Sequence, residues 1–149
     1  EALADSWLDR HHAALDSESI GLVTAVPASH WSRWTRWSNH ADVLAERLAR
    51  NLNLPCDTTI LRKVAWVQKQ GTLPTSARRA NVRHAFRGDK RVQLSGATIL
   101  LVDDVVTTGA TADACARQLK SLGASRVIVA TIARGLGRRG ILPPSVTIG

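Results

Sequence analysis

The chain has 149 residues, a length that suits one domain, and its 20 Lys and Arg outnumber 12 Asp and Glu, which gives a formal net charge of +8. With 2 cysteines and no run of about 18 apolar residues, the sequence is not expected to form a disulfide scaffold, a zinc cluster or a membrane-spanning helix. No signal-peptide pattern is present, and we expect a single cytoplasmic domain over residues 1–149.

Positive charge is concentrated in the middle of the chain. Residues 31–91 hold 13 Lys or Arg against 4 Asp or Glu, whereas the remaining residues hold 7 against 8. A basic segment of this kind suits the binding of phosphates or of nucleic acid.

The first expected elements are a helix and a strand. Apolar side chains recur at helical spacing in residues 2–16, which predicts an N-terminal helix within residues 1–20. Residues 22–26 form a short apolar run that ends at Pro27, and such a run is typical of a buried strand.

Tryptophan and arginine alternate in the next segment, residues 28–37. Arg33 and Arg36 lie between tryptophans that recur at every third position. Three interpretations stay open. The arginines can bind pyrophosphate together with backbone amides. The indoles can stack on the bases of a nucleic acid while the arginines bind its phosphates. The tryptophans can instead pack against neighbouring elements or a second subunit, as in a homodimer.

A second helix, a strand and a basic segment follow. Apolar residues recur at every third or fourth position over residues 41–52, with Ser38 as a candidate N-cap, and predict a helix. Residues 58–64 are typical of a second strand of the sheet. Residues 66–91 hold few apolar and many basic side chains, so we expect a flexible basic loop there.

Residues 97–111 (A-T-I-L-L-V-D-D-V-V-T-T-G-A-T) carry the strongest functional signal. A continuous apolar run ends at Val102 and is typical of a strand that is buried on both faces. Two acids, Asp103 and Asp104, follow at the expected end of this strand. A loop of small and hydroxyl-bearing residues then leads into the next helix: Thr107, Thr108, Gly109, Ala110 and Thr111.

This order of residues predicts a site for a sugar phosphate. In an open α/β sheet, ligands bind beyond the carboxyl ends of the strands. The loop before a helix offers unpaired N–H groups and the positive end of the helix dipole to a phosphate, and Gly109 leaves the backbone accessible. Asp103 and Asp104 would repel that phosphate, so we expect them to bind neutral hydroxyls or to help hold a cation.

The remaining elements complete an α/β pattern. Residues 112–122 have apolar side chains at helical spacing and are followed by Gly123, a typical helix end. Residues 126–133 predict another buried strand, and residues 146–148 can add an edge strand within the C-terminal tail, 134–149. With right-handed crossovers, these elements predict a central, mostly parallel sheet with helices on both faces.

Other interpretations of the acidic strand end fit the sequence less well. A response-regulator receiver domain needs a phosphoacceptor Asp on a later strand, but the only later acid, Asp113, falls inside a predicted helix. The nucleotide-binding P-loop motif G-x-x-x-x-G-K-[ST] does not occur. A purely structural strand–loop–helix unit rarely places two charges beside a hydroxyl-rich loop.

Residues 97–111 resemble the phosphoribosyl-pyrophosphate signature of the type I phosphoribosyltransferases. The resemblance implies the fold of that family, with Asp103 and Asp104 on the ribose hydroxyls and with the loop from Thr107 to Thr111 on the 5-phosphate. The implied ligand is phosphoribosyl pyrophosphate or a related sugar phosphate. The ligand would bring a magnesium ion that is held largely by the ligand's own oxygens. We expect no metal site formed by the protein alone.

The resemblance also suggests where pyrophosphate binds. Arg33, Arg36 and Arg78 are the candidates, and the basic loop over residues 66–91 would close as a lid over the leaving pyrophosphate. The alternative for this loop is a solvated, charged segment without a ligand.

Residues 26–134 further resemble the ComF/GntX branch of this family, the competence proteins linked to DNA uptake. The segment Arg36-Trp37-Ser38-Asn39-His40-Ala41 stands where the branch has Arg-Gly-Phe-Asn-Gln-Ala, with Trp37 and Ser38 in place of Gly and Phe. The middle segment of the branch is matched by Gln70, Leu73, Arg78, Asn81-Val82 and Ala85-Phe86. Many members of the branch begin with a four-cysteine zinc module, a pattern that these 149 residues do not contain. The resemblance implies phosphoribosyl transfer to an acceptor that the sequence does not identify. The alternative is a non-catalytic adaptor that binds single-stranded DNA or DNA-processing proteins.

Overall fold

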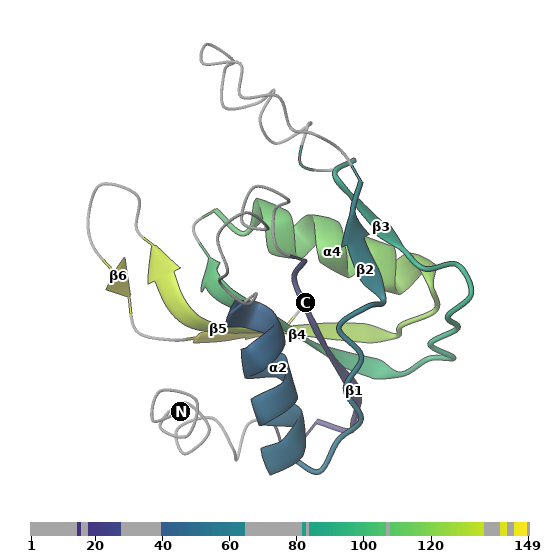
Figure 1. Ribbon diagram of the computed structural model, residues 1–149, viewed down its shortest axis with the longest axis horizontal. Coiled ribbons are helices and arrows are strands. Elements are labelled where there is room, and N and C mark those ends of the chain that lie inside the picture. Colours follow the sequence, from purple (N-terminus) through teal and green to yellow (C-terminus); the bar gives the residue numbers. More distant parts are fainter. Residues whose placement is uncertain are drawn as a thin grey trace.

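The computed structural model describes residues 15, 18–27, 40–64, 82, 84–106, 108–135, 141–142 and 145–148. Figure 1 shows the elements in these ranges. They are β1 (Ile20–Ala25), α2 (His40–Asn51), β2 (Leu61–Lys63), β3 (Phe86–Gly88), β4 (Thr98–Val106), α4 (Ala110–Ser121), β5 (Arg126–Gly135), β6 (Ile141–Leu142) and β7 (Ser145–Ile148).

The main sheet is built around β4, which lies between two parallel neighbours. β1 pairs with one edge of β4 and β5 with the other, so β4 exchanges backbone hydrogen bonds on both sides. β6 and β7 pair antiparallel with the far edge of β5. The predicted mostly parallel α/β sheet is therefore confirmed, and so is the predicted edge strand near the C-terminus.

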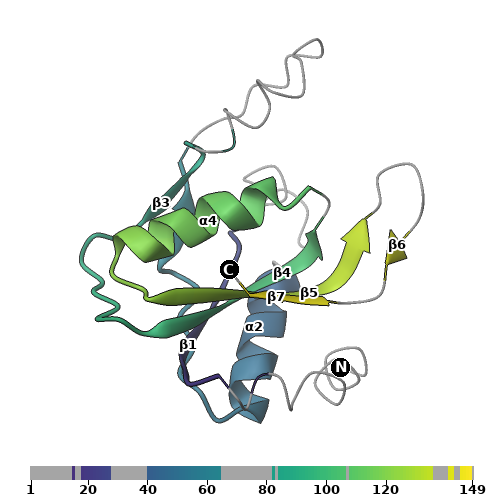
Figure 2. The same cartoon turned by 180° about the vertical axis from the view of Figure 1, so that it is seen from behind.

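The two described helices cover opposite faces of this sheet (Figure 2). Leu100 and Val102 of β4 share a buried cluster with α2, while Ile99 and Leu101 share the other buried cluster with Cys115 and Leu119 of α4. Successive side chains of a strand point to opposite faces. The continuous apolar run in β4 thus reflects its burial under a helix on each side.

The outer edge of β1 is covered by the chain that follows α2. The N–H of Val23 donates to the carbonyl of Pro55 at 2.9 Å, and the N–H of Asp57 donates to the carbonyl of Val23 at 3.0 Å. Cys56 thereby forms a parallel bridge with Val23. These bonds occupy the position beside β1 in which a further strand could pair.

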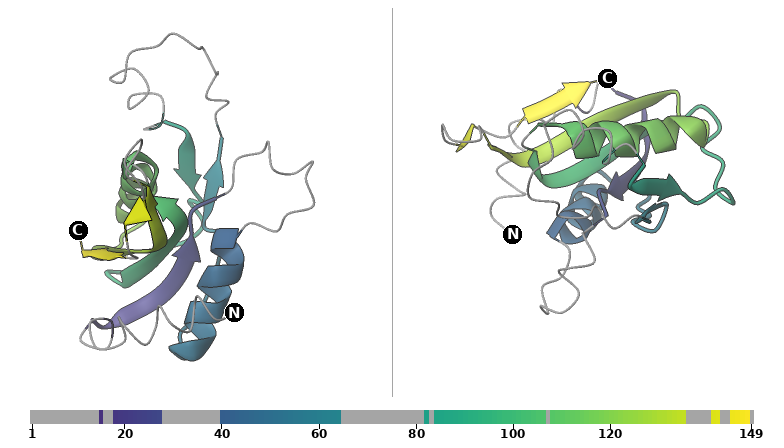
Figure 3. Two further views of the ribbon diagram at one scale, coloured as in Figure 1. Left: turned by 90° about the vertical axis from the view of Figure 1, so that its left-hand side faces the viewer. Right: turned by 90° about the horizontal axis from the view of Figure 1, so that it is seen from above.

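The predicted strand over residues 58–64 is corrected by this arrangement. Only Leu61–Lys63 is a strand, and it pairs antiparallel with β3 in a separate two-stranded sheet, since residues 55–57 already line β1. Figure 3 shows β2 and β3 as a separate ribbon beside α4. Gly88 of β3 lies close to Leu122, where an added Cβ would come within 2.8 Å of Cδ1.

The predicted loop over residues 66–91 is wrong at its C-terminal end. Phe86–Gly88 forms β3, because Phe86 is buried in the cluster under α4 and the N–H of Gly88 donates to Oε1 of Gln118 at 3.2 Å. Residues 65–81 and Arg83 lie outside the described residues. So do the Trp- and Arg-rich residues 28–37 and most of the predicted N-terminal helix, of which Leu15 is helical and buried.

Most other element boundaries lie within a few residues of the predictions. α2 begins at His40, and α4 ends before Gly123, whose φ of 100° is the left-handed conformation expected after a helix. Among the described residues, no helix has both the length and the apolar character needed to cross a membrane.

Candidate functional site

The turn between β4 and α4 leaves its backbone open to an approaching ligand. Gly109 is the N-cap residue of α4 and adopts φ 74° and ψ −3°, a left-handed conformation that glycine tolerates best. A Cβ built on Gly109 would meet no atom within 4 Å. The space above this glycine is therefore not filled by a neighbouring side chain of the described structure.

The first turn of α4 presents N–H groups at this opening. The N–H of Asp113 donates to the carbonyl of Gly109 at 2.9 Å, and the N–H of Ala110 makes a long contact of 3.4 Å with Oγ1 of Thr108. No described residue accepts a hydrogen bond from the N–H of Thr111 or Ala112. These donors, together with the helix dipole, favour an anion at the start of α4.

The predicted phosphate loop falls on this turn. Thr108 is exposed, and Gly109, Ala110 and Thr111 are half-buried at the helix start. Thr107 lies outside the described residues, so its predicted role stays a prediction.

Asp103 and Asp104 lie inside β4, not beyond its end as predicted. The strand continues to Val106 because Val105 and Val106 still pair with β5. Asp103 is opposite Thr131 of β5 in this register and is 7% exposed. Two further residues of strand thus separate the acids from the turn.

The surroundings of Asp103 disfavour its charge. Burial raises the pKa of Asp103 to about 7, and the charge of Asp104 and hydrogen bonding between the two carboxyls add to this rise. Hydrogen bonds from the N–H groups of Val105 and Asp104 act in the opposite direction. Asp104 is half-buried, and its Oδ1 accepts the N–H of Val105 at 2.8 Å. A ligand that donates hydrogen bonds to this pair would favour the ionised form of Asp103.

Cys115 of α4 lies within electrostatic range of Asp103. Burial raises the pKa of Cys115 to about 12, the charge of Asp103 adds to the rise, and Lys63 of β2 acts against it. The thiol is fully buried, as its place on the apolar side of the helix predicts. A thiol with this pKa is a packing residue and not a nucleophile.

The structure adds three residues to the site that were not predicted from the sequence. Lys63 brings a positive charge from the β2–β3 ribbon toward α4, although its sequence neighbours only suggest a mixed strand. Thr24 and Thr131 are buried with Asp103 on three adjacent strands, all on the face that α4 covers. Their only signal in the sequence is a hydroxyl at an apolar position of a strand.

The three predicted pyrophosphate residues, Arg33, Arg36 and Arg78, lie outside the described residues. The described part of the site therefore consists of the open start of α4 and of the two acids in the last turns of sequence before it, Asp103 and Asp104 of β4. This arrangement can bind an anion on main-chain amides and hydroxyl donors on carboxylates.

Comparisons with known proteins identify a family for this chain. The family model described as "Phosphoribosyl transferase domain" matches residues 13–143. The chain is 33% identical over 113 residues to competence protein F of Haemophilus influenzae, and the matched region covers 75% of this chain and 49% of that protein. It is 34% identical over 107 residues to DNA utilization protein YhgH of Escherichia coli K12, and here the matched region covers 72% of this chain and 45% of that protein. These identities confirm the predicted resemblance to the competence branch, and the chain spans about half the length of the curated relatives it matches.

Solved structures support the predicted fold class. The chain is similar to a purine phosphoribosyltransferase from Pyrococcus horikoshii, with a TM-score of 0.56 and 18% identity over 89% of this chain and 73% of that chain. An adenine phosphoribosyltransferase gives a TM-score of 0.60 and 18% identity, covering 90% and 68%. At such identities the likeness shows the fold alone.

Proposed function

Because this chain belongs to the phosphoribosyl transferase domain family, we propose that it binds 5-phosphoribosyl 1-pyrophosphate with magnesium. The observation that carries the proposal is the open start of α4 at Gly109, close along the chain to the acids Asp103 and Asp104. A phosphate and a neighbouring diol are the two parts of a ribose phosphate that such groups recognise.

The 5-phosphate would be bound at the start of α4. The N–H groups of Thr111 and Ala112 and the hydroxyl of the exposed Thr108 are the described donors there. Gly109 removes the side chain that would hold an anion away from these amides. Thr107 completes the proposed phosphate loop.

The ribose hydroxyls would be bound by Asp103 and Asp104. Burial and repulsion by a second carboxylate disfavour the ionised form of Asp103. A hydroxyl that donates a hydrogen bond to this carboxylate stabilises the ionised form, so the pair suits hydroxyl donors. Ligand binding is therefore expected to be coupled to the loss of a proton from Asp103.

The donor set also suits a magnesium ion. Carboxylate oxygens are the hard ligands that magnesium prefers, and Asp104 is half-buried with one oxygen engaged by the N–H of Val105. When bound, the ion would neutralise charge on the pyrophosphate. The described residues supply hydroxyl acceptors and amide donors, while Arg33, Arg36 and Arg78 are proposed for the pyrophosphate itself.

We propose that the bound ligand can transfer its phosphoribosyl group to an acceptor not yet identified. In that reaction a nucleophile attacks C1 of the ribose, and the bond from C1 to pyrophosphate breaks. Neither Thr107 nor Thr108 can act as a strong base at neutral pH. Catalysis would then rest on positioning and on charge stabilisation of the leaving pyrophosphate.

A second candidate function is an adaptor that binds single-stranded DNA or DNA-processing proteins. It is favoured by the excess of 13 basic over 4 acidic residues in residues 31–91 and by the names of the relatives, competence protein F and DNA utilization protein. Binding of this kind weakens steeply with added salt, whereas the proposed sugar-phosphate site requires magnesium.

Calorimetric titration of phosphoribosyl pyrophosphate, with and without magnesium, tests the leading proposal. We expect binding by the wild type with magnesium and its loss in Asp103→Asn/Asp104→Asn. Glu46→Gln, which removes an exposed acid from α2 on the opposite face of the sheet, is the matched control and should bind normally. An absence of heat at millimolar ligand, or unchanged binding by the double variant, would remove the proposal.

A further inference from the structure

Two arginines stand directly opposite each other on the β2–β3 ribbon. Arg62 of β2 pairs with Arg87 of β3 in the antiparallel register, and residues in such a pair project to the same side. Both side chains are exposed. The adjacent pair, Lys63 and Phe86, projects to the other side, where Phe86 is buried in the cluster that includes α4. The two guanidinium groups therefore point away from α4.

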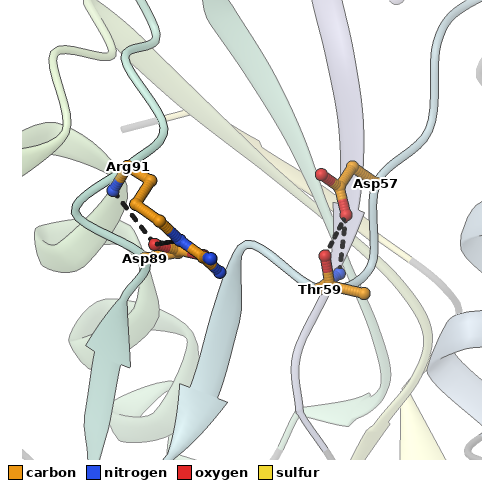
Figure 4. A network of polar contacts seen from close by, with 4 residues as sticks. All are labelled: Asp57, Thr59, Asp89 and Arg91. Atoms are coloured by element: carbon orange, nitrogen blue, oxygen red, sulfur yellow. Dashed lines mark hydrogen bonds and ion pairs between the residues drawn. The ribbon is translucent and has the colours of Figure 1, made fainter.

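The described part of the ribbon does not neutralise these charges. Residues 61–64 and 84–91 contain five Lys or Arg and one acid, Asp89. Asp89 is already engaged by Arg91, which donates to its two carboxylate oxygens at 2.7–3.1 Å (Figure 4). That contact is the main reason why the pKa of Asp89 is lowered to about 2, while Arg62 contributes only at longer range. No described residue forms an ion pair with Arg62 or Arg87.

Such a pair is costly unless a partner compensates for it. Like charges directly opposite each other in a sheet destabilise it. Lys90, also exposed, adds a third cation in the turn two residues after β3 ends. An anion bound across the ribbon would turn this repulsion into attraction, and arginine forks match the geometry of phosphate oxygens.

The shape of the surface indicates which kind of anion fits. Small ligands bind in concave pockets, whereas these side chains stand on the exposed side of a two-stranded ribbon. A chain of phosphates can lie across an exposed ribbon and contact several cations at once. The spacing of two opposite residues, about 5 Å between Cα atoms, allows both guanidinium groups to reach one stretch of backbone.

We propose that the outer face of the β2–β3 ribbon, which carries Arg62 and Arg87, binds the phosphodiester backbone of a nucleic acid without sequence preference. The proposal develops the second candidate function by naming its surface, and it does not depend on the sugar-phosphate site. Backbone contacts of this kind supply affinity and salt dependence but carry no sequence information.

Fluorescence anisotropy with a labelled oligothymidine, measured over a series of salt concentrations, tests this surface. We compare the wild type with Arg62→Gln/Arg87→Gln. The matched control is Arg50→Gln/Lys120→Gln, which removes two exposed cations from the helices. Each phosphate contact contributes about 0.7 to the slope of log K against log salt for a single strand. The ribbon variant should therefore bind more weakly, with a slope that is shallower by about 1.4, and the control should retain the wild-type slope.

Further variants keep each result interpretable. Arg62→Lys/Arg87→Lys retains both charges and should retain the salt slope. If the Gln variant lost binding through misfolding instead of lost charge, this variant would identify that cause. The oligonucleotide assay contains no phosphoribosyl pyrophosphate and no magnesium, so its outcome is independent of the sugar-phosphate proposal. A wild-type slope in the Arg62→Gln/Arg87→Gln variant, or an equal loss in the Arg50→Gln/Lys120→Gln control, would overturn the proposal. Duplex DNA of the same length shows whether single strands are preferred.

Discussion

Asp103 carries a carboxyl that burial, aided by the charge of Asp104, keeps largely protonated up to about pH 7. In an unfolded chain the same carboxyl ionises near its ordinary pKa of 3.8. Between these two values the folded state holds a proton that the unfolded state has lost, so stability falls as the pH rises through this window. Above about pH 7 both states are ionised and the loss is complete.

The Asp103→Asn variant should not show this fall. We expect the wild type to lose up to about 4 kcal/mol relative to the variant between about pH 4 and pH 7. Urea unfolding of both proteins at several pH values measures the difference. Parallel stability curves for the two proteins would contradict a raised pKa at Asp103.

Gly109 allows a direct test of the helix start because the chain offers a matched glycine. Gly109 and Gly96 have φ of 74° and 81°, and an added Cβ meets nothing within 4 Å at either position. A Cβ in the left-handed region costs roughly 1–2 kcal/mol. Both Gly109→Ala and Gly96→Ala should therefore lose a similar amount of stability by thermal unfolding.

Only one of these two variants should affect the ligand. Gly109→Ala places a methyl group over the proposed phosphate site, so its affinity for phosphoribosyl pyrophosphate should fall by at least tenfold, about 1.4 kcal/mol. Gly96→Ala lies in the turn before β4 and should bind as the wild type does in the same calorimetric assay. Equal affinities for the two variants would place the phosphate elsewhere.

At the scale of elements, the β2–β3 ribbon is stable despite its opposed arginines because its other side is packed on α4. Phe86 is buried there, and Gly88 lies against Leu122 with its N–H bonded to Gln118. These contacts hold the ribbon against the helix that begins at the proposed phosphate site.

The opposed arginines predict a stabilising substitution. Arg87→Glu replaces a like-charge pair by an opposite-charge pair across the ribbon, which should raise the free energy of unfolding by about 0.2–1 kcal/mol at low salt. The gain should shrink in high salt because both side chains are exposed. Chemical denaturation at two salt concentrations measures it. A loss of stability at low salt would show that the arginines do not repel each other.

The elements differ in how far the sequence predicts them. β4 and α4 follow from a continuous apolar run and from a helical repeat ended by Gly123, which are strong local signals. β3 is missed because a strand of three residues with a single buried aromatic side chain is too short to show an alternation of apolar and polar residues. The end of β4 is misplaced because two acids and a hydroxyl-rich loop suggest a strand end, while pairing with β5 extends the strand to Val106.

At the scale of the whole molecule, the family match over residues 13–143 spans the site and every strand of the main sheet except β7. The main sheet orders its strands as β1, β4, β5, with β4 in the centre, so the loop after β4 leaves the sheet between its two parallel neighbours. The described chain thus presents the turn at the carboxyl end of its central strand, where ligands of open α/β sheets bind.

The sequence by itself determined the α/β class, the central strand, the helix after it, and the order of acids and hydroxyl-rich turn at residues 103–111. These features depend on neighbours along the chain, and local periodicity records them. Only the tertiary structure decided that β2 and β3 leave the main sheet, that Asp103 is buried opposite Thr131, and that Arg62 faces Arg87. Such pairings join residues far apart in sequence, and they depend on which edges and faces other segments already occupy, so no local pattern encodes them.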